Sequence, residues 1–153
     1  PLLEQAEETE NVAYPRLCLR LYAVKPDGTK YVPDKSGLNQ WNAGGRQRNA
    51  NELYIPYLRE DRERDLGFFP PRDTSFTLKS IMSNPNKALG KWLLREVFEL
   101  PERTLVTYDM LRIFGIDSVM FTKIGDKRYQ IDFCDLGTYE RMYDLEDIEN
   151  ELI

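Results

Sequence analysis

Histidine does not occur among the 153 residues of this sequence. Its absence excludes the Ser-His-Asp and Cys-His hydrolases, histidine-ligated metal sites and the paired-histidine phosphodiesterases of the phospholipase D type. Cysteine is almost as scarce, because the chain has only Cys18 and Cys134. Two cysteines are too few for a disulfide framework or a four-thiolate zinc site, so we expect structural thiols and a reduced, cytoplasmic setting.

Long apolar runs are also missing. No stretch approaches the roughly 18 to 20 apolar residues that a membrane span needs, and no signal-peptide pattern opens the chain. The chain begins at Pro1 rather than at methionine, which we interpret as a piece of a longer protein. The sequence therefore predicts a protein without membrane contact.

Two motifs of phosphate chemistry are missing as well. The chain has no G-x-x-x-x-G-K-[ST] loop. Metal-dependent nucleases of the restriction type need an acid followed by an acid-x-lysine pair on adjacent strands. The nearest candidates, Asp117 with Lys123 and Asp126 with Asp132, lack that spacing. We therefore expect no catalytic residue, no metal and no cofactor in this chain.

The net charge of −5 is distributed unevenly along the chain. Residues 1–11 carry four acids and no base, and residues 135–153 carry seven acids against one base, so these ends hold −4 and −6 and residues 12–134 hold +5. We interpret 1–11 as an acidic linker or tail, 12–134 as the folded domain and 135–153 as an acidic helical extension. A modestly basic body is compatible with a polyanionic partner.

Alternation of apolar and polar residues predicts several short β-strands. Leu17, Leu19 and Leu21 alternate with less apolar neighbours, which is typical of a strand with one buried face. A Pro-Asp-Gly turn follows and leads into a return strand. Strand patterns occupy 15–24, 30–32, 52–58, 75–79, 117–124 and 127–133, and the last two form a hairpin at Gly125-Asp126.

Helical spacing is confined to three segments. Apolar residues recur at helical intervals over 90–100, before Pro101. A shorter helix is predicted over 107–115, with Thr107 as its N-cap and Gly115 just past its end. The third segment, 138–152, is an acidic amphipathic helix that must dock on another surface. The charged run 59–65 is expected to be a surface loop.

This order of elements favours a mainly antiparallel β architecture over a doubly wound parallel sheet. About seven short strands with two helices between them show no alternating strand–helix rhythm, which argues against a doubly wound parallel sheet. The expected fold is mainly β: an antiparallel, partly closed barrel with two short helices and a C-terminal amphipathic helix.

Residues 34–51 break the strand pattern and predict a long exposed loop rich in Asn, Gly, Gln and Arg. Asn and Gln match the edge of adenine and Arg matches guanine, so this composition fits base recognition in the major groove. Trp41 either packs the base of the loop or lies flat against a sugar. The alternative is that Asn and Gly are simply common in loops. The candidate DNA-binding residues here are Lys35, Ser36, Asn39, Gln40, Trp41, Asn42, Arg46, Gln47, Arg48, Asn49 and Asn51.

A second stretch without acids, residues 79–95, combines the same chemistry. Asn84 and Asn86 lie in a predicted turn, and Lys87 and Lys91 follow at a helix start, where backbone N–H groups also favour phosphate. In isolation, the two lysines are equally well explained as ordinary surface residues. Two such stretches in one small domain could grip a duplex from two sides, which favours DNA binding.

The order of the segments resembles a known family. The runs KSGLNQWNAGGRQRNANELYIPYL, GFFPPR, SFTL, NKAL, LGKWL, LVTYDMLRIFG and VMFTKIGDKRYQIDF are similar to the C-terminal B3-like DNA-binding domain of the NgoFVII/NgoAVII group of restriction endonucleases. The similarity covers residues 16–134. In that family a nuclease domain of the phospholipase D type precedes this domain and needs histidine, which this chain lacks.

This resemblance implies a seven-stranded open barrel, a B3-like pseudobarrel, whose two arms enter the major groove of double-stranded DNA. The N-arm would be 36–51 and the C-arm about 83–91, although the segment between Lys79 and Gly90 is shorter than in such domains; Arg72 would contact a phosphate. The chain would be the non-catalytic target-recognition domain of a bacterial restriction endonuclease, with an N-terminal nuclease domain or a second subunit as its protein partner. The alternative is a protein-interaction or oligomerisation module that docks through the acidic C-terminal helix.

Overall fold

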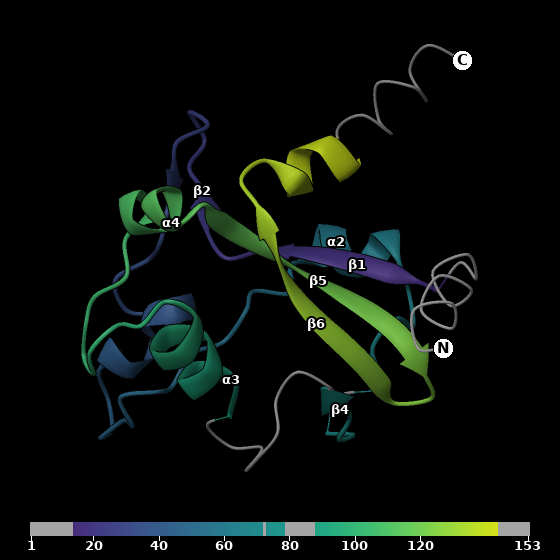
Figure 1. Ribbon diagram of the computed structural model, residues 1–153, viewed down its shortest axis with the longest axis horizontal. Helices are drawn as coiled ribbons and strands as arrows, with labels where there is room; N and C mark the ends of the chain where they lie inside the picture. Colours follow the sequence, from purple (N-terminus) through teal and green to yellow (C-terminus); the bar gives the residue numbers. More distant parts are fainter. Residues whose placement is uncertain (1–13, 72, 79–87, 144–153) are drawn as a thin grey trace, which may run out of the picture.

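A four-stranded sheet lies at the centre of the computed structural model, which describes residues 14–71, 73–78 and 88–143 (Figure 1). The strand order is β1-β5-β6-β4. β1 (Arg16–Arg20) pairs antiparallel with β5 (Ile116–Gly125), which pairs antiparallel with β6 (Arg128–Asp135). β4 (Thr77–Leu78) lies parallel to β6 at its outer edge. The first strand of the described chain is thus held against a hairpin from its far end.

The expected seven-stranded barrel is wrong. The described residues form a mixed α/β structure, in which a two-stranded sheet of β2 (Ala23–Val24) and β3 (Lys30–Tyr31) stays separate from the four-stranded one and no barrel closes. Segment 52–58, expected as a strand, bonds instead to the 3₁₀-helix η1 (Gly37–Asn42): the Trp41 N–H donates to the Glu52 carbonyl, and the Tyr54 N–H donates to the Gly37 carbonyl. Pro56 also removes a donor that a central strand would need.

The turns that the sequence marked are confirmed. β5 and β6 form the predicted hairpin, with Gly125 opposite Arg128 across a two-residue loop. In the earlier Pro-Asp-Gly turn, the Thr29 N–H donates to Asp27 Oδ1 (2.9 Å) and Gly28 has a φ of 90°. Glycine adopts this left-handed conformation without a steric penalty, so the chain reverses here on local grounds.

The two faces of the sheet carry different cores. Leu17, Leu19, Val119, Phe121 and Ile131 belong to the large hydrophobic core on one face. On the other face, Cys18 and Met120 form a small cluster with two tyrosines of the C-terminal segment, Tyr139 and Tyr143. Cys18 is buried, and both cysteines are free thiols. The predicted strand is thus confirmed as β1, but the prediction that only one of its faces is buried is wrong, because Leu17 and Leu19 pack on one face and Cys18 packs on the other.

The predicted helix over 107–115 is confirmed as α4 (Tyr108–Phe114). The Thr107 hydroxyl accepts a hydrogen bond from the Met110 N–H (3.3 Å), as an N-cap does. Gly115 follows the helix with a φ of 77°, the left-handed conformation that commonly ends helices.

The predicted helix over 90–100 is present with a different winding. α3 (Ala88–Gly90) continues into η2 (Lys91–Val97), a π-helix in which hydrogen bonds span five residues, as from the Phe98 N–H to the Leu93 carbonyl. A Cβ on Gly90 would lie 1.7 Å from the carbonyl oxygen of Asn51. Glycine therefore permits the close contact that joins segment 36–51 to this helix.

The charged run 59–65, expected as a loop, contains a helix, α2 (Arg59–Arg64). Its Asp61 is buried, so one face of this run packs against the protein and the loop prediction is wrong. Residues 138–143 are helical, as predicted, whereas 144–152 and the acidic segment 1–11 lie outside the described residues. Within the described ranges, none of the helices has the length and apolar character needed to cross a membrane.

Candidate nucleic-acid interface

Asn39 belongs to the framework of the candidate site. Its side chain is fully buried. Asn39 Nδ2 donates to the carbonyl oxygens of Pro33 (2.9 Å) and Val106 (2.8 Å), and Oδ1 accepts from the Val106 N–H (2.9 Å). An amide pairs with buried backbone as readily as with a base edge. The structure thus gives Asn39 a structural role in place of the predicted base contact.

The residues around Asn39 are also partly enclosed. Ser36, Gln40 and Trp41 are half-buried. The indole nitrogen of Trp41 is buried and has no hydrogen-bond partner among the described residues. Of the two roles considered for Trp41, packing at the base of the loop is the one that its burial fits.

Arg46 and Arg48 both pair with Glu52, which the sequence reasoning did not single out. Arg46 Nη1 and Nη2 donate to the two Glu52 carboxylate oxygens (3.1 and 3.0 Å), and Arg48 Nη1 donates to one of them (3.4 Å). Arg48 also donates to the Ala43 and Gly44 carbonyls (2.9 and 3.3 Å). The side chain of Arg46 is 60% exposed and that of Arg48 is 14% exposed. Arg48 therefore braces the loop, and Arg46 is the one that can reach outward.

Arg95 fixes the end of this loop, although the sequence reasoning did not select it among the candidate residues of the acid-free stretch 79–95. Its guanidinium donates to Asn51 Oδ1 (2.9 Å) and to the carbonyl oxygens of Ala50 (2.8 Å), Leu100 (3.0 Å) and Pro101 (2.6 Å). Burial lowers the pKa of Arg95. Asn51 is thereby occupied as an acceptor inside the protein, so the structure places Asn51 in the framework.

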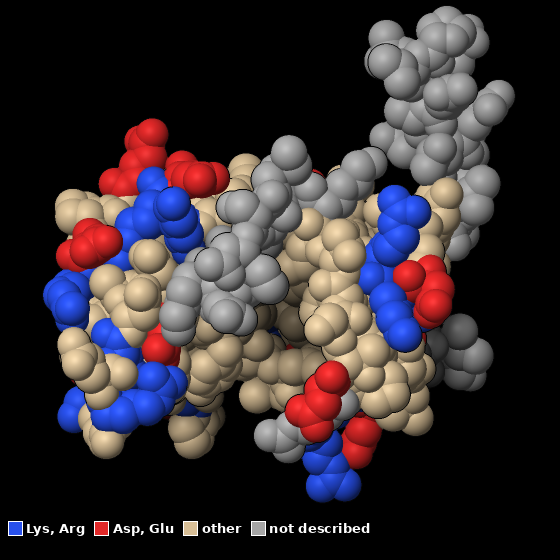
Figure 2. All heavy atoms as spheres, turned by 90° about the horizontal axis from the view of Figure 1, so that it is seen from below, with Lys and Arg blue, Asp and Glu red and all other residues tan. Residues whose placement is uncertain are grey.

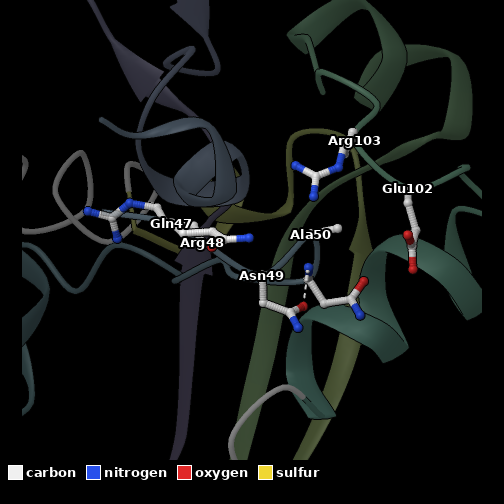
Figure 3. Close-up of a pocket in the computed structure, with 7 residues that line it drawn as sticks. Gln47, Arg48, Asn49, Ala50, Glu102 and Arg103 are labelled. Carbon is white, nitrogen blue, oxygen red and sulfur yellow. Dashed lines mark hydrogen bonds between the residues drawn. The ribbon is translucent and has the colours of Figure 1, made fainter. Parts of the chain in front are cut away.

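Between this loop and the segment before α4 lies a cavity of about 460 Å³, called the polar cavity below (Figure 3). Ala50 is the only one of its lining residues with an apolar side chain. In Figure 3, the Arg103 guanidinium extends toward the segment that carries Gln47, Arg48 and Asn49, whereas the Arg48 guanidinium is directed away from Arg103. Sequence reasoning missed Glu102 and Arg103, because neither lies in an acid-free stretch. The lining residues are Gln47, Arg48, Asn49, Ala50, Asn51, Glu102 and Arg103.

Other predicted contacts lie around this end of the protein. Lys35, Asn42, Gln47, Asn49 and Lys91 are exposed. In Figure 2, Lys and Arg side chains gather, interleaved with acids, at the end of the protein that carries α3 in Figure 1. The predicted contacts Arg72, Asn84, Asn86 and Lys87 lie outside the described residues, so the C-arm has no described geometry. We call residues 34–51 and 101–104 the polar end.

The C-terminal helix docks on the face of the sheet that carries Cys18 and Met120. A cluster that we call the tyrosine latch holds it there: Arg20, Asp61, Arg64, Tyr139 and Tyr143. The Tyr139 hydroxyl donates to Asp61 Oδ1 (2.7 Å), which also accepts from Arg64 Nη1 (2.9 Å). The Tyr143 hydroxyl accepts from the Cys18 N–H (2.8 Å). Arg20 lies 4.3 Å from the Tyr139 ring centroid and Arg64 lies 3.6 Å from that of Tyr143. The described part of the helix thus docks on its own domain.

A neighbouring cluster joins Asp117 and Glu140 through Lys30. Lys30 forms an ion pair with Glu140 and lies 4.0 Å from Asp117, whose Oδ2 accepts from the Tyr108 hydroxyl (2.9 Å). Burial raises the pKa of Asp117. Burial alone would raise the pKa of Glu140 too, but hydrogen bonds from Lys30 and Tyr22 outweigh it and lower the pKa. Among the described residues, no group of three side chains that could hold a metal ion occurs.

No protein-family model matches this chain, and neither does any curated protein. The function must therefore be argued from the polar end itself. Its chemistry is that of exposed amides and cations on a rigid framework of buried polar side chains.

Proposed function

We propose that this chain binds double-stranded DNA through its polar end, as the non-catalytic target-recognition part of a bacterial restriction endonuclease that works in the cytoplasm. The observation that carries the proposal is the exposure of Arg46, Gln47 and Asn49 on one short segment, which Asn39 and Arg95 hold in place. Arg, Gln and Asn are the side chains that discriminate bases in the major groove. The resemblance of residues 16–134 to target-recognition domains supports the same class of ligand.

Within this proposal, Arg46 is the base-reading arginine and Arg48 is a brace. Arg46 can exchange Glu52 for a guanine more readily than Arg48 can, because its side chain is 60% exposed and Arg48 continues to pair with Glu52 when Arg46 leaves. Moving Arg48 would break bonds to two backbone carbonyls as well. Gln47 and Asn49 project from the same segment and would read neighbouring positions.

Phosphate contacts come from lysines at the rim of the same surface. Lys35 and Lys91 are exposed and form no ion pair with the described residues. The positive charge of residues 12–134 supports a polyanionic ligand. Arg72 and Lys87 stay predicted as phosphate contacts, and Asn84 and Asn86 stay predicted as base contacts.

The test begins with selection of a preferred site from a random duplex library, followed by fluorescence anisotropy on that site and on scrambled duplex. Arg46→Ala should cost about 1–3 kcal/mol on the selected site and little on scrambled DNA. Arg59→Ala is the matched control, since Arg59 is an exposed arginine, paired with Glu63, on α2. Equal losses on both duplexes for Arg46→Ala would contradict base reading.

Lys91→Ala tests the proposed electrostatic contacts with DNA phosphates. Both duplexes should lose affinity to the same extent, and the slope of log K against log salt should flatten by about 0.9 for one lost phosphate contact. A wild-type chain without salt-dependent DNA binding would refute the proposal. That result would favour the alternative, an interaction module that uses the acidic C-terminal extension beyond residue 143. Cleavage of DNA by this chain with Mg²⁺ would refute its non-catalytic role.

A further inference from the structure

Arg103 is a cation of the polar cavity that has no partner among the described residues. Its side chain is exposed and makes no hydrogen bond or ion pair with the described residues. Arg48, which also lines the cavity, is already engaged by Glu52 and two carbonyls. The Arg103 guanidinium, which extends toward the 47–49 segment, is thus the group of this cavity that can pair with an anion (Figure 3).

The backbone holds Arg103 in an uncommon conformation. Its φ is 61°, which costs of order 1 kcal/mol for a residue with a side chain and is usually reserved for glycine or asparagine. The turn that imposes this conformation is fixed at Pro101, whose carbonyl accepts from the Thr104 hydroxyl (2.7 Å) and from Arg95 (2.6 Å). The same arginine that anchors the 50–51 loop therefore also positions the Arg103 turn.

The lining chemistry indicates which part of a nucleic acid fits. An extruded base is usually stacked between aromatic or apolar side chains, and this cavity offers Ala50 as its only apolar side chain. A phosphodiester needs a cation and N–H donors, which Arg103 and the amides of Gln47 and Asn49 supply. The cavity therefore fits a phosphate group rather than a base.

We propose that Arg103 is a further DNA-binding residue, which binds a backbone phosphate over the polar cavity while the adjoining segment 46–49 faces the bases. This inference rests on the proposed function and adds a third element, the turn before α4, to the two arms expected from the sequence. The phosphate contact would set the register of Arg46, Gln47 and Asn49 on the duplex, because backbone contacts position a protein without reading sequence.

The experiment compares Arg103→Gln, which keeps the length of the side chain, with wild type on the selected and the scrambled duplex across a range of salt. Affinity should fall about fivefold on both duplexes, and the slope of log K against log salt should flatten by about 0.9. Arg103→Lys should keep the salt slope. Glu102→Gln should tighten binding about twofold, because it removes a negative charge from the cavity lining.

Arg112→Gln is the matched control, because it removes the same charge from an exposed arginine that pairs with Asp109 on nearby α4. It should leave the salt slope unchanged. The inference is overturned if Arg103→Gln, with a wild-type melting curve, binds like Arg112→Gln, or if only the selected duplex is affected. In those cases the salt-dependent binding of the wild type leaves the proposed function standing; a wild type that binds no DNA overturns both.

Discussion

The tyrosine latch and the polar end use the same kinds of side chain in opposite ways. In the latch, Arg64 stacks on Tyr143 and pairs with Asp61, and every side chain meets another from a distant part of the chain. At the polar end, Arg103 and Gln47 are exposed and make no side-chain bonds with the described residues. The number of partners, and not the residue type, therefore separates structure from candidate function in this protein.

The same division runs through the polar end itself. Asn39, within the polar end, and Arg95, on the neighbouring η2, each form several hydrogen bonds, and the exposed segment 46–49 lies between the residues that they contact. The polar end thus combines residues that are hydrogen-bonded within the protein with exposed side chains that have few or no partners among the described residues. Four substitutions, ordered by their expected effect on stability, test which side chains are structural. Two are in the polar end, one is in the latch and one is in the cluster beside it.

Asn39→Ala should have the largest effect. It leaves the buried carbonyl and N–H of Val106 and the part-buried carbonyl of Pro33 without their partner. Each loss at a buried group costs about 1–3 kcal/mol, so we expect the free energy of unfolding to fall by about 3 kcal/mol in urea denaturation. Wild-type stability for this variant would show that the Asn39 side chain is not needed for folding and would restore it as a base-reading candidate.

Tyr139→Phe tests the latch. The substitution removes the hydroxyl that donates to the buried Asp61 carboxylate, and hydrogen bonds to charged groups contribute about 1.5–3 kcal/mol, so unfolding should become about 2 kcal/mol easier. Tyr31→Phe is the control, because the exposed Tyr31 hydroxyl bonds to none of the described residues. Equal stability of the two variants would mean that the Tyr139 hydroxyl contributes nothing to the docking of the helix.

Glu140→Gln tests how the stabilising contribution of Glu140, in the cluster beside the tyrosine latch, depends on pH. Because the folded protein lowers the pKa of Glu140 below its ordinary value of 4.5, the stabilising contribution is complete above that pH and is lost as the pH falls through the folded value. The wild type should be about 1 kcal/mol more stable than the variant at pH 7, since a third of the side chain is exposed and screened. Denaturation at pH 7 and at about pH 3 should show this difference shrinking. A difference that grows in acid would contradict the assignment.

Gln47→Ala should have the smallest effect on stability, less than about 0.5 kcal/mol, because it is an exposed surface substitution that breaks no hydrogen bond. Affinity for the selected duplex should nevertheless fall while affinity for scrambled DNA stays the same. Thermal melting and anisotropy on one preparation measure both. A destabilised Gln47→Ala would place this residue with Asn39 among the structural side chains.

Local signals in the sequence were sufficient to predict the backbone structure where the interacting residues are neighbours in the chain. The β5–β6 hairpin, the Asp27-Gly28 turn and the Thr107 and Gly115 caps of α4 were all predicted, because a few adjacent residues set the backbone there. The predictions failed for 52–58 and 59–65, where an apolar alternation and a charged run had more than one structural solution. Packing of Asp61 against Tyr139, 78 residues away, decided the second case.

By itself, the sequence determined the absence of histidine chemistry, the basic body between acidic ends and the polar character of residues 34–51. Only the tertiary structure decided which of those polar residues are available to a ligand. The reason is physical: an amide or a guanidinium bonds equally well to a buried carbonyl and to a nucleic acid. Asn39 meets Val106, 67 residues away, and Arg95 meets Asn51, 44 residues away, whereas Arg103 meets no such partner among the described residues.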